Sequence, residues 1–235
     1  MKRDMLVLVL CFCLVIGGAW FGKNSGEAAE QAFAAAEAGG FQLVLDAGHG
    51  GEDGGALSAA GDKESNVNLS IVLRMDQLLG LCGVLPILTR SEDVSIYDAG
   101  ASTLREKKVS DIHNRVALVE SQPSPLLVSV HQNSYPDARY SGAQVFSGRT
   151  EESRIWGEAA QEILRQCLDE NNSRAAKRIP DTVYLMNHIS CPAIVVECGF
   201  MSNREETARL QTPEYQKKLA AALTGACLQY IHSDT

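Results

Sequence analysis

The chain has 235 residues, of which 45% are hydrophobic and 21% are charged, a composition typical of a globular protein rather than a disordered or fibrous one. A formal net charge of −8, no Lys/Arg-rich block and only 6% aromatic residues argue against nucleic acid as a partner. The seven cysteines are scattered without a C-x-x-C pair, which argues against a disulfide framework and a thiolate zinc site, and we expect those within LLGLCG and VECGF to be buried.

The N-terminal segment is predicted to direct the chain out of the cytoplasm. Lys2 and Arg3 precede an uncharged apolar run over residues 5–22, the order of an export signal. The run is also just long enough to span a bilayer, so residues 1–22 are either a cleaved signal peptide or an uncleaved signal anchor. Residues 23–40 are rich in Ala, Gly and Glu, which is typical of a linker.

From residue 41 onward, apolar runs typical of buried strands alternate with segments of helical periodicity. The predicted strands are 41–46, 84–89, 126–131, 143–148, 183–186 and 192–197. Helical stripes fall on 67–82, 109–119 and 156–167, and a last helix begins at Thr212-Pro213. This alternation predicts that 41–235 is a single α/β domain, with a largely parallel, roughly six-stranded twisted sheet and helices on both faces.

Three ionisable side chains follow or close predicted strands: His49, His131 and Glu197. The carboxyl ends of strands in an open α/β sheet share one edge, so these groups are expected to converge there. Two imidazoles and a carboxylate form a ligand set of catalytic zinc that leaves one position open for water. Such a site needs a further acid as the base, and Glu64, just ahead of a predicted helix, is the candidate.

Each of these side chains also has a simpler interpretation. Glu64 could be an acid of a helix first turn, and His49 a loop histidine bonded to backbone. For Glu197 this alternative is weak, because an acid ending an apolar strand is costly to desolvate. The glycines around His49 do not form a dinucleotide-binding loop, since Asp53 stands where the third glycine belongs. No G-x-S-x-G is present for a serine nucleophile.

Four segments together resemble one enzyme family. LVLDAGHGGEDGGA, E-x-x-x-N-L from Glu64, SVHQNS and PAIVVECGFMSNREE are similar, in that order, to the zinc-dependent N-acetylmuramoyl-L-alanine amidases of bacterial walls, over about 41–233. The resemblance implies that His49, Glu64 and His131 hold Zn²⁺ and that Glu197 is the catalytic acid/base. It departs mildly at Ala47, where the family often has proline, and at Ser134, where it often has alanine.

The implied reaction cleaves the amide between the lactyl group of N-acetylmuramic acid and L-alanine of the stem peptide. Asn133 is a candidate to bind the substrate, whereas His113, His188 and His232 are expected to be ordinary histidines. Two other functions remain open: a zinc peptidase that cuts within the stem peptide, and a catalytically inactive protein that binds peptidoglycan.

Within this family the chain is similar to the germination-specific amidases of spore cortex. It is short, has one N-terminal apolar segment and carries REKKVSDIHNR over 105–115. The resemblance implies a role in spore cortex maturation and germination, including muramic-lactam formation. We expect an extracytoplasmic enzyme, secreted or membrane-anchored through 1–22, that acts on peptidoglycan. Recruitment by a partner and membrane confinement are the two ways of reaching the substrate that stay open, and an accessory activator protein is a candidate partner.

Overall fold

The computed structural model of this chain describes residues 40–233. The expectations for a signal or anchor at 1–22 and for a linker at 23–40 therefore lie outside the described residues, apart from Gly40. Within 40–233, no helix is both long enough and apolar enough to cross a bilayer.

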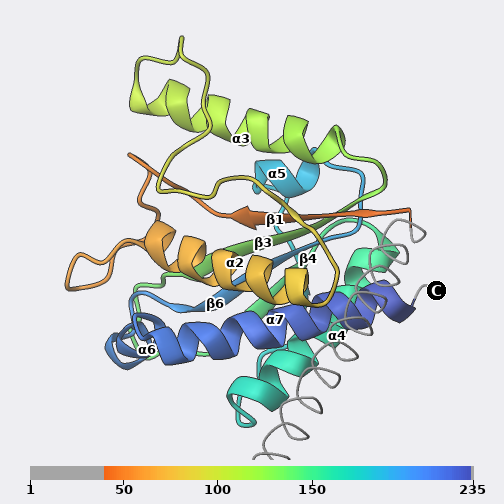
Figure 1. The fold of residues 1–235 in the computed structure, drawn as a ribbon. Coiled ribbons are helices and arrows are strands. Elements are labelled where there is room, and N and C mark those ends of the chain that lie inside the picture. Colours follow the sequence, from red (N-terminus) through yellow and green to blue (C-terminus); the bar gives the residue numbers. More distant parts are fainter. Residues whose placement is uncertain (1–39, 234–235) are drawn as a thin grey trace, which may run out of the picture.

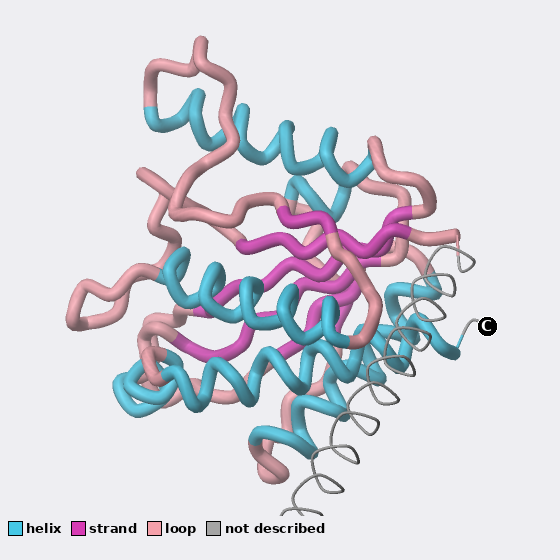
Figure 2. Tube along the Cα trace, in the orientation of Figure 1, coloured by secondary structure: helices cyan, strands magenta, loops and turns pink. Residues whose placement is uncertain are grey.

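A six-stranded mixed sheet forms the centre of the described domain (Figures 1 and 2). Its strands, in spatial order, are β2 (Ile87–Leu88), β1 (Gln42–Ala47), β3 (Pro125–Asn133), β6 (Ala193–Phe200), β4 (Gln144–Ser147) and β5 (Lys177–Arg178). The first four are mutually parallel, whereas β4 runs antiparallel to β6 and parallel to β5. The prediction of a single α/β domain with a largely parallel, six-stranded sheet is confirmed.

Helices cover both faces of this sheet. On one face lie α2 (Glu64–Leu81), α4 (Glu151–Leu168) and α7 (Pro213–Ser233), and on the other α3 (Leu104–Glu120) and α5 (Tyr184–Asn187) (Figure 1). Because successive side chains of a strand alternate between faces, Leu43 and Leu45 pack toward α2, while Val44 packs on the α3 side. Each face thus has its own apolar cluster.

Three local predictions need correction. Residues 183–186 are not a strand, because Tyr184–Asn187 form one short turn of helix. The predicted strand over 84–89 shrinks to the two residues of β2, and the sixth strand is instead the exposed, charged pair of β5. A short helix, α6 (Arg204–Leu210), follows β6 without having been predicted.

The expectation for the cysteines holds only in part. Cys198 of VECGF is buried, as are Cys191 and Cys227, and all three are free thiols. Cys82 of LLGLCG is exposed instead, because it lies one residue past α2, where the chain turns away from the core. Among the described cysteines, five are free and none is paired.

Helix α3 is attached to the sheet by a buried arginine. Arg115 and Val119 are the only two buried residues of this helix. The Arg115 guanidinium forms an ion pair with Asp46 of β1, and both side chains are almost inaccessible to solvent, at 2% and 1% exposed. Burial alone would raise the pKa of Asp46, but Arg115 and the hydroxyls of Thr89 and Ser129 lower it to about 2. The Asp46 carboxylate therefore stays charged and holds α3 against the strand.

Replacing Arg115 by methionine should destabilise the fold strongly. The change leaves the Asp46 carboxylate buried without its cation, which costs about 3–5 kcal/mol of unfolding free energy. Urea unfolding measures this loss. Arg154→Met is the matched control, since Arg154 also pairs with two carboxylates, Glu151 and Glu158, but at the exposed surface of α4, so little change is expected. Equal effects of the two substitutions would contradict a special role for the buried pair.

Candidate metal centre

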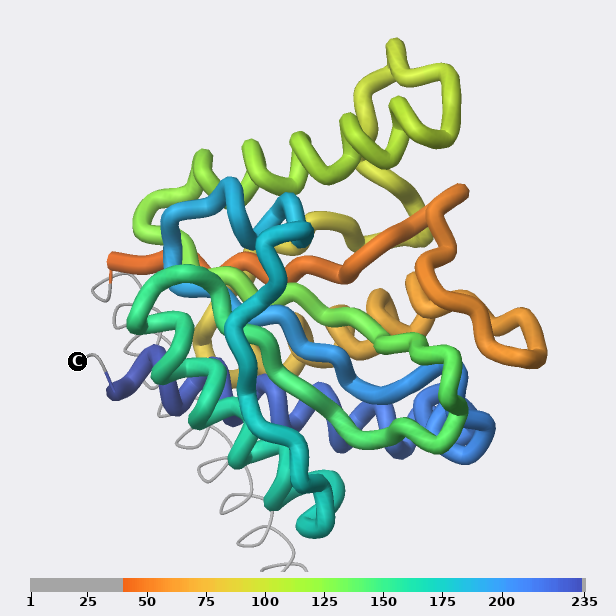
Figure 3. Tube along the Cα trace, turned by 180° about the vertical axis from the view of Figure 1, so that it is seen from behind, coloured from red at the N-terminus to blue at the C-terminus, as the bar shows by residue number. Residues whose placement is uncertain are grey.

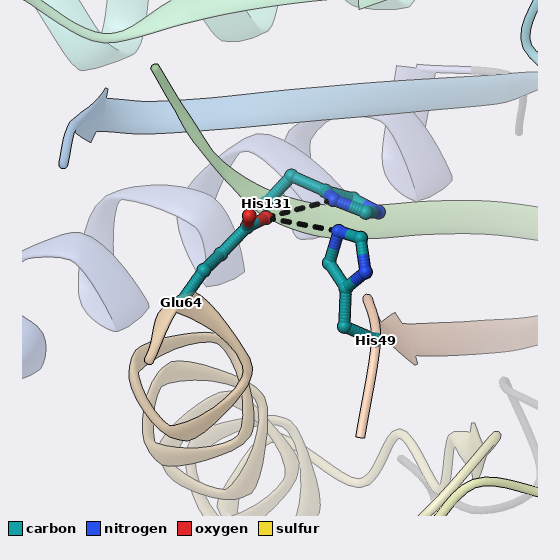
Figure 4. Close-up of side chains that lie close together, drawn as sticks. All are labelled: His49, Glu64 and His131. Atoms are coloured by element: carbon teal, nitrogen blue, oxygen red, sulfur yellow. Dashed lines mark hydrogen bonds and ion pairs between the residues drawn. The ribbon is translucent and has the colours of Figure 1, made fainter. Parts of the chain in front are cut away.

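Three side chains from separate parts of the chain meet at the carboxyl edge of the sheet. His49 follows β1, Glu64 is the first residue of α2, and His131 lies near the end of β3 (Figure 4). One ligand atom from each of them can be chosen so that all three lie within 4.8 Å of one another. A Glu64 carboxylate oxygen is 3.0 Å from His131 Nδ1 and 3.5 Å from His49 Nε2, so the carboxylate lies between the two imidazoles.

The position of His49 is fixed by its backbone and by its ring. Its φ of 62° is in the left-handed region, which a non-glycine residue adopts only when its surroundings impose it. The Arg115 guanidinium donates to the carbonyl of His49 at 2.8 Å, and Arg90 donates to the carbonyls of Ala47 and Gly48. The His49 ring nitrogen Nδ1 lies 3.0 Å from the carboxylate of Asp53.

Asp53 has the role that a carboxylate plays behind many ligand histidines. Burial would raise the pKa of Asp53, but hydrogen bonds from His49 and Lys108 hold it well below its usual range. A charged carboxylate on Nδ1 sets the tautomer and leaves Nε2 of His49 free to face Glu64 and His131. Lys108 belongs to α3, so the same helix stabilises His49 through its ring and through its backbone.

Two glycines allow the groups to approach this closely. A Cβ added at Gly48 would lie 2.2 Å from ring atoms of His131. At Gly55, where φ is +68°, a Cβ would lie 2.5 Å from a carboxylate oxygen of Glu64 and 2.7 Å from the ring of His49. The glycine-rich sequence around His49 therefore serves to bring backbone next to the cluster.

Glu64 and His131 shift each other's pKa in opposite directions. Burial would raise the pKa of Glu64, but His131, His49 and the backbone N–H of Gln132 lower it to about 2. Burial would lower the pKa of His131, but Glu64 and then Glu197 raise it to about 9. A cation placed between these groups would replace the proton that His131 holds, so metal binding here must release a proton.

Glu197 lies beside this cluster with a different environment. It is the cross-strand neighbour of His131, on β6, and both side chains face the α3 side of the sheet. Its Oε2 atom is buried and has no hydrogen-bond partner among the described residues. Burial raises the pKa of Glu197 to about 7, with His131 opposing the shift and Glu64 adding to it. A half-buried carboxyl that titrates near neutrality is suited to take up and return a proton.

The other predicted residues lie around the cluster or away from it. Asn133 ends β3, two residues past His131, and its side-chain oxygen accepts from the N–H of Ser134 at 2.8 Å. A contact of Asn133 with substrate stays a prediction. His113, His188 and His232 are exposed and lie outside the cluster. The sequence did not predict that Asp53 and Arg115 position His49. The only sequence signal for Asp53 is an acid four residues after His49, and the only one for Arg115 is an arginine on a polar helix.

The donor set fits a divalent transition metal. Two imidazoles and one carboxylate are ligand types that Zn²⁺ takes in catalytic sites. The carboxylate is already ionised, one imidazole has a carboxylate behind it, and the glycines leave room at the backbone. Such a set at the carboxyl edge of a sheet, next to a carboxyl of raised pKa, has the side chains that the site of a metal-dependent hydrolase requires.

Comparison with known proteins identifies the family. The sequence model of the Amidase_3 family, described as N-acetylmuramoyl-L-alanine amidase, matches residues 43–229. The chain belongs to this family and is an N-acetylmuramoyl-L-alanine amidase, a hydrolase that acts on peptidoglycan and hence outside the cytoplasm.

Individual relatives agree with this assignment. The germination-specific N-acetylmuramoyl-L-alanine amidase of Bacillus subtilis is 37% identical over 192 residues, covering 80% of this chain and 79% of the relative. The CwlD amidase of Clostridioides difficile, solved in complex with the GerS lipoprotein, has a TM-score of 0.78 and 34% identity over 83% of this chain and 99% of its own. An amidase of Clostridium difficile 630, at 21% identity and a TM-score of 0.72 over 84% of this chain and all of its own, shares the fold.

Gly48→Ala should weaken metal binding while leaving the fold in place. The new Cβ lies 2.2 Å from the His131 ring, which must turn away from Glu64. We expect metal affinity to fall by about 10–100-fold, measured by calorimetric titration of the chelator-treated protein with Zn²⁺. Gly80→Ala is the control, because its Cβ on α2 would meet no atom within 4 Å. Wild-type affinity in Gly48→Ala would show that the glycine is not needed for the site.

In the metal-free protein, Glu197→Gln should raise stability only at neutral and alkaline pH. Folding raises the pKa of Glu197 from 4.5 to about 7, so the folded state disfavours the ionised form. The loss of stability from ionising buried Glu197 is absent below about pH 4.5 and complete above about pH 7. Glu197→Gln should therefore raise the free energy of unfolding by about 1–3 kcal/mol at pH 8 and leave it unchanged at pH 4. Unfolding by urea at both values checks the sign. A gain independent of pH would contradict it.

Proposed function

We propose that His49, Glu64 and His131 hold a Zn²⁺ ion and that Glu197 is the general acid/base of the amidase reaction. The observation that carries this proposal is the pairing of two environments: a carboxylate of lowered pKa between two imidazoles, and a second carboxyl of raised pKa with an unpartnered buried oxygen beside it. When bound there, the ion supplies Lewis-acid polarisation of the scissile carbonyl and makes water more acidic.

The protein's own groups then move the proton. Glu197 accepts a proton from the attacking water, because its carboxylate is the one near His131 that is not engaged by backbone N–H groups. It returns this proton to the nitrogen of L-alanine as the amide bond breaks, which lets the stem peptide leave as a neutral amine. Burial raises the pKa of the Glu197 carboxyl, which favours a group that can return the proton as well as accept it.

Glu64 and Asp53 serve binding rather than proton transfer. Glu64 accepts hydrogen bonds from the backbone N–H groups of Ala56 and Gln132 and from the amide of Asn68, which fix its carboxylate between the histidines. Asp53 orients His49 from behind. These contacts support Glu64 as a ligand and Glu197 as the base, the roles implied by the family resemblance.

The likeness to named relatives supports a narrower role and a partner. The relative from Bacillus subtilis is germination-specific, and the CwlD amidase of Clostridioides difficile was solved with the GerS lipoprotein. We infer that this chain acts on spore cortex peptidoglycan, held at the outer side of the membrane by residues 1–22 or released from it, and that an accessory protein assists it. Digestion of cortex and of vegetative-cell peptidoglycan side by side tests the substrate preference.

Incubation of the purified, zinc-loaded protein with peptidoglycan tests the centre directly. Mass spectrometry should show free stem peptides that begin with L-alanine, and a chelator should abolish them. Glu197→Gln should keep stoichiometric zinc by elemental analysis and lose about 10²–10⁴ in turnover. Glu158→Gln, at an exposed position of α4, is the control and should cleave like the wild type.

Three results would speak against the proposal. Fragments cut within the stem peptide would indicate a peptidase instead. Turnover by Glu197→Gln at the wild-type rate would remove Glu197 from the reaction. Full zinc occupancy in Glu64→Ala would remove Glu64 from the ligand set.

A further inference from the structure

Two tyrosine rings lie next to each other on the surface, in the loop of residues 134–143 between β3 and β4. Tyr135 and Tyr140 are 49% and 45% exposed, and their ring centroids are 4.6 Å apart at an interplanar angle of 54°. Tyr140 also lies 6.2 Å from the ring of buried Phe200. Together, Tyr135 and Tyr140 form a continuous aromatic surface that we call the tyrosine platform. An exposed aromatic pair of this kind is typical of a binding surface rather than of a core.

The loop that carries the platform begins and ends beside the candidate metal centre. The loop leaves β3 just after His131 and Asn133, and it enters β4 at Gln144, which pairs across the sheet with Glu197. Both of its ends are therefore fixed beside residues of the proposed centre. In the view from behind, this loop lies with α6 at the same sheet edge as the segment between β1 and α2 (Figure 3).

The loop is held in place by contacts to β6 and α6. The N–H of Tyr135 donates to Ser202 Oγ at 3.0 Å, and Asn203 donates to the carbonyl of Tyr140 at 3.3 Å. The N–H of Gly142 donates to the buried carboxylate of Glu206 at 2.9 Å. A surface that is already ordered loses little conformational entropy when a ligand binds.

Two arginines lie beside the platform, and both are engaged by neighbouring groups: Arg174 donates to the carbonyl of Ser141 and to the side chain of Gln144. Arg174 lies over the rings of Tyr140 and Phe200, with its guanidinium carbon 5.7 Å and 4.6 Å from their centroids. Arg139 is paired with Asp137 at 2.7 Å. An exposed aromatic surface whose neighbouring arginines are engaged by other groups suits a ligand with apolar faces and polar edges.

The substrate has such a part beside the bond that is cut. The scissile carbonyl is joined to the sugar ring of N-acetylmuramic acid by a short lactyl ether, so the glycan strand must pass close to the centre. A pyranose ring offers C–H faces to aromatic rings and hydroxyls to phenol groups, and tyrosine supplies both in one rigid side chain. We propose that the tyrosine platform is a subsite for an N-acetylated sugar of the glycan strand.

This subsite rests on the proposed function, because it places the acyl side of the scissile amide toward β4 and α6. Contacts to a part of the substrate that does not react hold the amide in position, so their loss lowers turnover as well as affinity. The platform therefore favours polymeric glycan over isolated muramyl peptides.

The test measures the binding of chitotetraose, the uncharged tetrasaccharide of β-1,4-linked N-acetylglucosamine, to the full-length protein by calorimetry. This probe has no lactyl group, so it offers neither an amide to cleave nor a carboxylate to bind the metal, and a failed metal centre cannot be mistaken for a failed subsite. Tyr135→Ala with Tyr140→Ala should weaken binding by about tenfold or more. Tyr135→Phe with Tyr140→Phe keeps the rings and should retain most of the affinity.

Tyr184→Ala is the matched control, because Tyr184 is a partly exposed tyrosine on α5, 38% accessible, and stacks on His188. It should bind the tetrasaccharide like the wild type. Equal affinity of the wild type and the double alanine variant would overturn the proposal. The proposal would also be overturned if the double alanine variant kept its affinity for the tetrasaccharide but lost affinity for free stem peptides. Unchanged zinc content and thermal midpoint in the double alanine variant show that its loss is not one of folding.

Discussion

The ion pair between Asp46 and Arg115 joins parts of the chain that share few other contacts. Asp46 is on β1 and Arg115 is on α3. Of the two hydroxyls that donate to Asp46, that of Thr89 follows β2 and that of Ser129 lies in β3. The Arg115 guanidinium also donates hydrogen bonds to the backbone carbonyls of Ala47 and His49. Burying a carboxylate and a guanidinium is favourable only when nearly all their hydrogen bonds are made, and here those bonds fix the backbone from which the His49 ring extends. Structural stability and the placement of one candidate ligand thus depend on one contact.

Much of this arrangement could be predicted because the pattern of strands is simple. Apolar runs that end in His131 and Glu197 predict parallel strands with both side chains at one edge, and this edge is where they lie. Residues 183–186 show the limit: an apolar run of only four residues fits a helical turn as well as a strand, and packing of Leu185 and Met186 under α3 decides for the turn. Arg115 could not be assigned, since an arginine on a polar helix usually faces solvent and nothing local marks its buried carboxylate partner.

The roles of the two acids show why spacing alone is insufficient. Strand ends indicate which edge of the sheet a side chain occupies, and on that basis Glu197 belongs with the histidines as a ligand. Which carboxylate lies between two imidazoles is decided by the packing of α2, whose first residue reaches across the edge because Gly55 leaves space for it. Glu197 remains on its strand, flanked by apolar residues, and this desolvation rather than its sequence position gives it a raised pKa. The residues packed around Glu64 and Glu197 therefore give two chemically identical carboxyl groups different pKa values and different roles.

Both outer strands of the sheet are only two residues long. β2 and β5 close the sheet with Ile87–Leu88 and with the charged, exposed pair Lys177–Arg178. An edge strand of ordinary length presents a row of unpaired N–H and C=O groups that can template pairing with another chain, whereas these edges offer almost none, and one of them carries two positive charges. The domain is thus protected against edge-to-edge aggregation at both sides of its sheet.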